Sequence, residues 1–261
     1  MTDTCRTYKR RVVSFLAASI FLCVPLLATA DILLRNTKHN LSVSGPGAVT
    51  ASQETQICIF CHAPHNATPA QPLWNHDPSA VQTYKVRWSN TLQAYTEAES
   101  LAWPVDGYSK LCLDCHDGTV AVGAVSSRND AILMSASLCV DASGRLIQGG
   151  SDCTGYVGTD LSGGHPISFI FDGILVSKRN NPDLGLTHIK LPVDQHVKLY
   201  PTHGCTGRCG VQCTSCHDPH TNRTVEGDKD GKPWPPFWQK GHFDDVCLAC
   251  HEEIPPGNIQ W

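Results

Sequence analysis

The sequence predicts a fold of mostly coil with short helices and a few short β-strands. Three observations predict it. The 261 residues include 17 Pro and 21 Gly spread along the chain, and both residues interrupt regular elements. Long amphipathic periodicity, the main signal of an extended helix or sheet, is absent. The third observation is a set of four Cys-x-x-Cys-His motifs.

The four motifs have the spacing that attaches haem covalently. Two thiols three residues apart can add to the two vinyl groups of one haem, and the following His is then held under the iron as its proximal ligand. The attaching cysteines are Cys58, Cys61, Cys112, Cys115, Cys213, Cys216, Cys247 and Cys250, and the proximal ligands are His62, His116, His217 and His251. The sequence thus predicts four covalently bound haem c groups, with iron, and a core built around four stacked haems whose apolar faces replace side-chain packing.

Two other chemistries use Cys-x-x-Cys pairs. Structural zinc needs pairs of pairs and no His after each one. Here every pair carries that His, and separations of 54, 101 and 34 residues between successive first cysteines suit no common zinc module. A thioredoxin-like redox pair normally occurs once. Haem attachment is therefore favoured.

The first thirty residues are typical of a secretory signal peptide. Four basic residues precede an apolar run from Val12 to Leu27, and Ala28-Thr29-Ala30 offers a cleavage site. A membrane anchor is the alternative, but the run is short and contains Pro25. We expect a secreted chain that begins at Asp31, lies outside the cell or on its outer surface, or alternatively in the periplasm, and has no later transmembrane segment.

Charge and the remaining cysteines fit export. Removing residues 1–30 takes away four basic residues and one acidic residue, which leaves 16 Lys and Arg against 23 Asp and Glu, a net charge of -7. An acidic surface argues against nucleic acid as a partner. Export permits disulfides. We expect Cys139 to pair with Cys153, while a pairing of Cys205 with Cys209 would close a short loop that often strains the bond.

The second axial ligand is predicted to be histidine. Met134 is the one methionine after the signal peptide, whereas nine histidines lie outside the motifs. A His three residues after a proximal His cannot easily reach the same iron, but it can reach a neighbouring haem. The predicted distal ligands are His39, His65, His165 and His220; the reserves are His76 and His242; His188, His196 and His203 are expected on the surface or in loops.

The motifs alternate in type, which predicts two dihaem units. The first and third continue to Pro-His, whereas the second and fourth are followed by an acidic residue. The predicted units span 31–130 and 195–261, with a haem-free insert at 131–194 that holds a disulfide and a strand hairpin formed by Ile167–Phe171 and Ile174–Val176. The best helical segments are Tyr95–Ala102 and Leu111–Asp117.

Several stretches resemble known cytochromes. Cys58–His65 and Cys213–His220 resemble multihaem c-type cytochromes of the doubled-CXXCH type. With Lys38–Ser42, Pro72–Asn75, His116–Val120 and Gly164–Ile167, they resemble the tetrahaem outer-surface cytochromes that polymerise into extracellular nanowires of metal-respiring bacteria. The resemblance implies bis-His haems in a stacked chain, and a homopolymer in which His65 or His39 crosses to the next subunit.

The predicted function is electron transfer, without catalysis of a substrate reaction. The chain would serve as a subunit of a conductive filament or as a periplasmic shuttle, with other cytochromes or redox proteins as partners. A multihaem reductase is the second hypothesis, and it needs one haem with an open site and nearby acid-base groups. A redox sensor or storage protein is the third, although no transmitter segment is visible.

Overall fold

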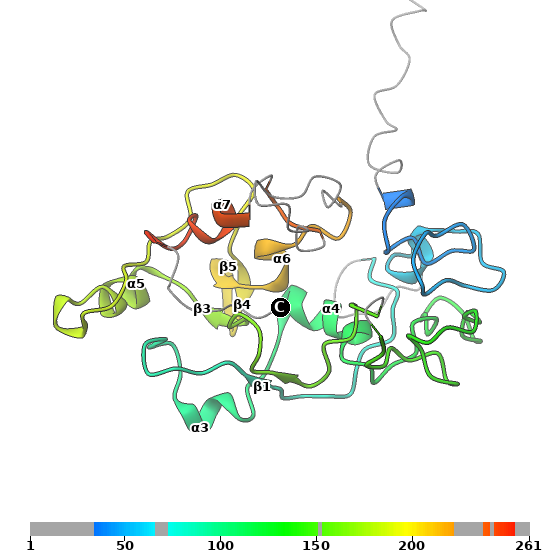
Figure 1. Ribbon diagram of the computed structural model, residues 1–261, viewed down its shortest axis with the longest axis horizontal. Helices are drawn as coiled ribbons and strands as arrows, with labels where there is room; N and C mark the ends of the chain where they lie inside the picture. The colour runs from blue at the N-terminus through cyan, green and yellow to red at the C-terminus, as the bar shows by residue number, and fades with distance from the viewer. Residues whose placement is uncertain (1–33, 66–72, 151–152, 222–236, 241–242, 254–261) are drawn as a thin grey trace, which may run out of the picture. The chain divides into compact units, whose positions relative to one another are not determined.

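The computed structural model describes residues 34–65, 73–150, 153–221, 237–240 and 243–253 (Figure 1). The predicted signal peptide, residues 1–30, lies outside these ranges. Coil, turns and bends predominate in the described chain, with a few short helices and strands. This content agrees with the predicted mixture of elements, while the haem-built core stays a prediction.

The helices are short, and side-chain caps explain where several of them begin. Thr96 and Glu99 form a capping box at the start of α3 (Glu97–Ser100). The longest helix, α4 (Gly107–His116), has ten residues and overlaps the predicted helix at 111–117. The remaining helical elements are the 3-10 turns η1 (Cys58–Phe60) and η2 (Pro182–Leu184) and the α-helices α5 (Gly173–Arg179), α6 (Cys213–Cys216) and α7 (Phe243–Cys247).

The predicted strand hairpin at 167–176 is wrong in its second half. Strand β3 (Phe169–Ile170) is present, with Phe169 buried and Ile170 exposed. The following apolar run lies in helix α5 instead. Asp172 causes the change, because its carboxylate accepts hydrogen bonds from the amides of Ile174 and Leu175 and so caps a helix.

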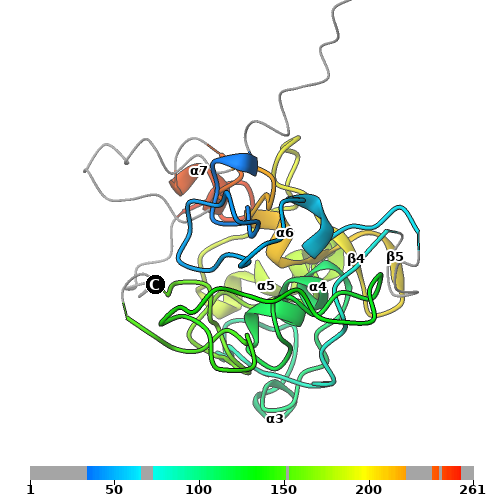
Figure 2. The ribbon, with the colours of Figure 1, turned by 90° about the vertical axis from the view of Figure 1, so that its right-hand side faces the viewer.

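The described strands between residues 85 and 211 form two small sheets. Strands β3, β5 (Cys205–Val211) and β4 (Tyr200–Thr202) form an antiparallel sheet in the order β3-β5-β4. Figure 2 shows β4 and β5 side by side. Strands β1 (Lys85–Val86) and β2 (Asp160–Leu161) form a parallel pair. Because β5 ends two residues before α6, the larger sheet fixes the start of the third motif.

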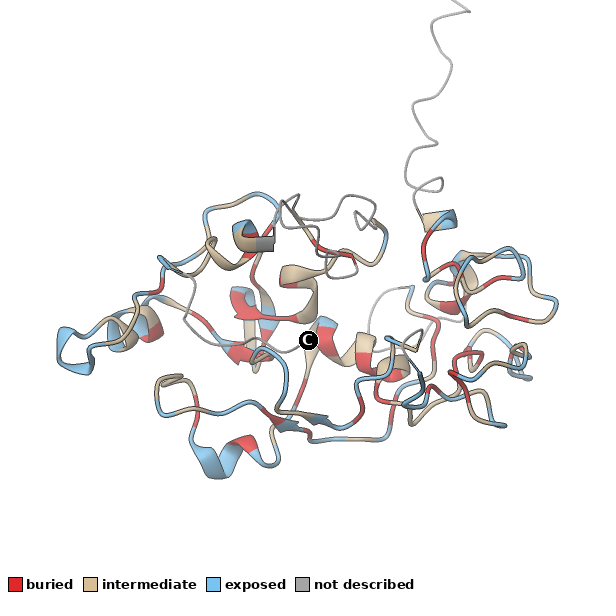
Figure 3. Cartoon of the chain, viewed as in Figure 1, coloured by how far each residue is buried: buried red, intermediate tan, exposed pale blue. Residues whose placement is uncertain are grey.

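Buried side chains form several small clusters, and red segments in Figure 3 are short and scattered. One cluster joins Tyr84, Leu113 and Phe169 with neighbouring apolar residues. Motif cysteines contact these clusters: Cys61 packs near Phe60, and Cys216 packs near Trp238. The apolar clusters and the motifs therefore share the same regions of the molecule.

The expected disulfide is present, and so is the pairing of Cys205 with Cys209 that the short loop had left open. Cys139 pairs with Cys153 at a Cα–Cα distance of 5.0 Å, and Cys205 pairs with Cys209 at 6.5 Å. Both separations lie within the range that disulfides tolerate. In the described part of the chain, every helix is too short or too polar to cross a membrane.

Candidate haem-binding sites

Each motif lies on or beside one turn of helix. The amide of His62 donates to the carbonyl of Cys58 at 2.8 Å. The amides of His217 and His251 make the same bond to the first cysteine of their motifs, each at 2.9 Å. An i→i+4 bond closes a helical turn, which brings positions i, i+3 and i+4 to one side. Each turn therefore groups both thiols and the His of one motif.

All eight motif cysteines are unpaired, whereas the other four described cysteines form disulfides. Burial raises the pKa of Cys61 to about 11 and that of Cys250 to about 11. Burial likewise raises the pKa of Cys115. The motif thiols thus remain available in pairs, each pair beside one imidazole. This donor set fits a haem that takes two thioether bonds and one proximal ligand.

His39 faces the proximal histidine of the second motif. The ring centroids of His39 and His116 are 6.0 Å apart. The Nδ1 atom of His39 lies 3.1 Å from the carbonyl oxygen of Pro219, and Nδ1 of His116 bonds the carbonyl of Gly155. In metal sites a second bond of this kind fixes the ring and leaves Nε2 for the metal. Phe237 stacks on His39 with centroids 4.1 Å apart.

His220 faces the proximal histidine of the first motif. The centroids of His62 and His220 are 6.2 Å apart. Asp218 lies 3.4 Å from Nδ1 of His220 and raises the pKa of that ring through a hydrogen bond. Burial lowers the pKa of His62, and the charge of His220 lowers it further. A His three residues after one proximal ligand thus lies opposite the proximal ligand of another motif.

His165 faces the proximal histidine of the fourth motif. The centroids of His165 and His251 are 6.4 Å apart, and Nδ1 of His165 lies 2.8 Å from the carbonyl oxygen of Pro166. The Nδ1 atom of His251 is buried without a hydrogen-bond partner. Within the described chain, His251 therefore lacks the orienting Nδ1 bond that His39, His116 and His165 have.

The three separations agree with two imidazoles on opposite sides of one iron. A metal–imidazole bond is about 2 Å long, so the two ligand nitrogens would be about 4 Å apart. The distance from each nitrogen to its own ring centre adds about 1 Å per ring, which gives about 6 Å between centroids. The observed values are 6.0, 6.2 and 6.4 Å. The residues present therefore fit bis-His haem.

The third motif and His65 have other surroundings. The ring of His217 lies edge-on to Trp238, with centroids 5.2 Å apart, and the backbones of these two residues form a β-bridge. His65 is exposed. It lines a cavity of about 460 Å³ together with Cys58 and His62. The assignment of His65 to an iron stays a prediction.

The other histidines have different roles. His76 is fully buried, and its two ring nitrogens lie 2.8 Å and 3.2 Å from the carbonyl oxygens of Asp77 and Ala121. The nitrogen that carries the proton in the neutral ring donates to its carbonyl, which favours a structural role for His76. The expected surface and loop histidines are exposed or half-buried, as predicted: His188, His196 and His203. The reserve His242 lies outside the described residues.

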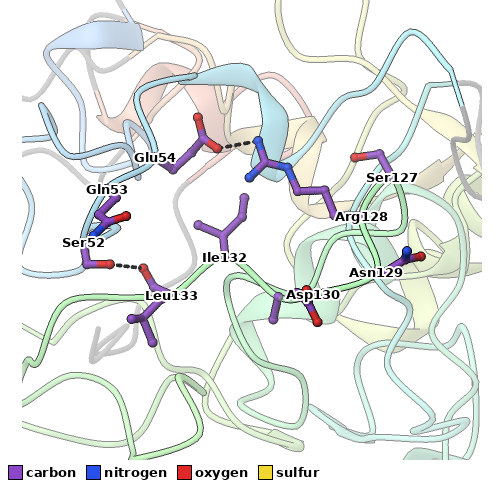
Figure 4. Close-up of a pocket in the computed structure, with 10 residues that line it drawn as sticks. Ser52, Gln53, Glu54, Ser127, Arg128, Asn129, Asp130, Ile132 and Leu133 are labelled. Atoms are coloured by element: carbon purple, nitrogen blue, oxygen red, sulfur yellow. Dashed lines mark hydrogen bonds and ion pairs between the residues drawn. The ribbon is translucent and has the colours of Figure 1, made fainter.

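A polar cavity of about 680 Å³ lies near the first motif (Figure 4). In it, Arg128 forms an ion pair with Glu54 at 2.5 Å, and Ser52 donates a hydrogen bond to the carbonyl of Leu133. No motif in the sequence singles out these residues. Within the described chain, no three or more His, Cys, Asp or Glu side chains converge as a direct metal site, and a haem iron needs only two protein ligands.

Sequence reasoning missed the groups that orient the facing rings. The carbonyls of Gly155 and Pro219 are backbone groups, and residue type carries no signal for them. Asp218 does have a signal, since it follows the motif histidine directly. No family model matches the chain, and no curated protein is significantly similar to it. The motifs and the histidine geometry are therefore the features that point to a function.

Proposed function

We propose that this chain is a secreted tetrahaem c-type cytochrome whose work is electron transfer. The observation that carries the proposal is the set of three histidine pairs, each joining a motif histidine to a distant histidine at 6.0 to 6.4 Å. Three of the four predicted distal ligands take part. When bound, the haems supply one-electron chemistry, because their iron alternates between the ferric and ferrous states.

The cysteines provide the attachment. Each motif thiol would add across one vinyl group of a haem, with its sulfur bonded to one carbon and its hydrogen to the other, so nothing would be released. Helical turns hold the two thiols of a motif three residues apart, with the proximal histidine next in sequence. Attachment at two points fixes the orientation of the cofactor relative to the backbone.

The facing histidines favour electron transfer over catalysis. If His39, His165 and His220 each held an iron together with the motif histidine they face, no position would be left there for a substrate or a small molecule. Carbonyl groups of Gly155, Pro219 and Pro166 hold the Nδ1 atoms of three of these rings. Such bonds keep the rings in place, which limits the rearrangement that a change of iron charge would cause.

The proposal includes assembly into a filament. His39 is packed between His116 and Phe237, which leaves exposed His65 as the better candidate to reach a neighbouring copy. We propose that His65 supplies a distal ligand across a subunit interface in a homopolymer on the outer cell surface, with other cytochromes as electron donors and acceptors. A monomeric periplasmic shuttle is the alternative.

Two measurements test the haem proposal. Intact mass of the native protein should exceed the peptide mass by four haems, and the ferrous protein should not bind carbon monoxide tightly.

His165→Ala should open the haem of the fourth motif and create carbon monoxide binding, whereas the matched variant His188→Ala, at an exposed residue, should not. A bare peptide mass would refute the proposal, and tight carbon monoxide binding by the unmodified, assembled protein would favour a reductase.

A further inference from the structure

The helices that carry the second and third motifs are joined by two reciprocal buried hydrogen bonds. The amide of Ser109, in α4, donates to the side-chain oxygen of Gln212 at 2.9 Å. The amide of Cys213, in α6, donates to the hydroxyl of Ser109 at 2.9 Å. The exposed fraction is 0% for Ser109 and 1% for Gln212. Each helix thus uses a side chain of the other to satisfy an amide of its own first turn, where helices have unpaired donors.

A second layer of contacts holds Gln212 in place. Its backbone amide donates a hydrogen bond to the hydroxyl of Ser215 at 3.0 Å. Its side-chain nitrogen lies 3.4 Å from Asp106, the residue that precedes α4. Asp106 in turn accepts a hydrogen bond from the hydroxyl of Thr202 at 2.6 Å. The network therefore joins the start of α4 to both β4 and α6.

Gly107 permits this close approach. Its φ angle is +57°, and a Cβ atom there would lie 2.9 Å from the carbonyl oxygen of Pro201 and 3.1 Å from the side-chain nitrogen of Gln212. A larger residue would be strained by its backbone conformation and would press on the network. The backbone is thus shaped to bring the two helices together at this point.

The network stands next to two haem-attaching cysteines. Cys112 lies three residues after Ser109 on α4, and Cys213 directly follows Gln212. Helix α4, which carries Cys112, packs on α6, which begins at Cys213 (Figure 1). Whatever fixes the two helices therefore also fixes the distance between these two attachment points.

We propose that Ser109 and Gln212 are positioning residues that set the separation and relative orientation of the haems on the second and third motifs. The inference rests on the proposed function and deepens it. Apolar packing alone is not directional. A buried amide that loses its hydrogen-bond partner costs free energy, so these bonds favour one arrangement of the two helices. Two reciprocal bonds therefore define one register between the helices.

The test uses Gln212→Leu and the milder Ser109→Ala in the full, haem-loaded chain. The readout is the Soret circular dichroism couplet, which depends on the distance and angle between neighbouring haems. We expect its amplitude to fall by roughly half or more in each variant, because unsatisfied amides must find new partners and the helices shift. Haem content and the absorption spectrum of bis-His iron should stay unchanged. Gln82→Leu is the control, since Gln82 is exposed and bonds only the nearby Ala80 carbonyl.

The outcomes separate this inference from the proposed function. A wild-type couplet in both variants, with four haems bound, would overturn the positioning role and leave the cytochrome proposal intact. Fewer than four haems in the unmodified protein would refute the proposed function itself. If Gln212→Leu does not accumulate, the couplet of Ser109→Ala decides the question, because that variant removes only one hydroxyl.

Discussion

Burial keeps two of the facing imidazoles neutral over most of the pH range. Burial is the largest cause that lowers the pKa of His39 to about 4, followed by the charge of His116. Burial also lowers the pKa of His251 to about 4, followed by the charge of His165. Neutral imidazole is the form that binds a metal. These rings are therefore ready to act as ligands at neutral pH without a proton-releasing step.

Asp194 should make stability depend on acid pH. A hydrogen bond from Lys240 lowers the pKa of Asp194 to about 2, with help from the amides of His196 and Val197. Because the folded pKa lies below the unfolded value of about 4, the contribution is complete above about pH 4 and is lost as pH falls to about 2. Asp194→Asn should lower the free energy of unfolding by about 1 kcal/mol at pH 7, a value reduced by solvent screening.

Urea unfolding at pH 7 and at low pH would measure this difference. The difference in unfolding free energy between the unmodified protein and Asp194→Asn should shrink toward zero as the pH approaches the folded pKa of about 2. The exposed Asp130 provides a control, since Asp130→Asn changes charge by the same amount. A difference that did not vary with pH would show that Asp194 acts through its amide hydrogen bonds and not through its charge.

At the scale of elements, the cap of α5 is the clearest target. Asp172 accepts hydrogen bonds from two first-turn amides at 3.0 and 2.9 Å. Asp172→Ala should cost about 1 kcal/mol, the usual value of a lost N-cap, whereas Asp172→Asn should retain most of the stability because Asn caps equally well. Chemical denaturation would measure both. Equal losses in the two variants would contradict the capping role and point to the charge.

The same element shows how far sequence could predict the fold. Local signals predicted helices at 95–102 and 111–117 and the disulfide between Cys139 and Cys153. The structure has helices at 97–100 and 107–116, and it contains that disulfide. The β-branched run at 174–176 suggested a strand, yet the cap at Asp172 decided for a helix. Local patterns also predicted His39, His165 and His220 as distal ligands. They did not predict which motif histidine each ring would face, because that depends on contacts between segments distant in sequence.

At the scale of the whole molecule, the motifs are linked across the chain. Residues 33–261 form one structural unit. His220, beside the third motif, faces His62 of the first, and α4 packs on α6. The division into two dihaem units stays a prediction. Cys216 of the third motif and Cys250 of the fourth pack on the same apolar cluster. Together these links would bring all four attachment sites into one connected arrangement, which the proposed electron transfer between the haems requires.

A continuous path over many copies would need one more link, and His65 is the residue proposed to make it. The native protein should form ordered filaments by electron microscopy. His65→Ala should still bind four haems but reduce the filament fraction by at least about tenfold, since loss of a ligand bond across the interface removes well over the 1.4 kcal/mol that a tenfold change represents. His196→Ala, at another exposed histidine, should assemble normally.

Filaments of His65→Ala that matched the native ones would refute the bridging role. A native protein that stayed monomeric at every concentration would instead favour the periplasmic shuttle, because its haems would then exchange electrons only by collision with partners.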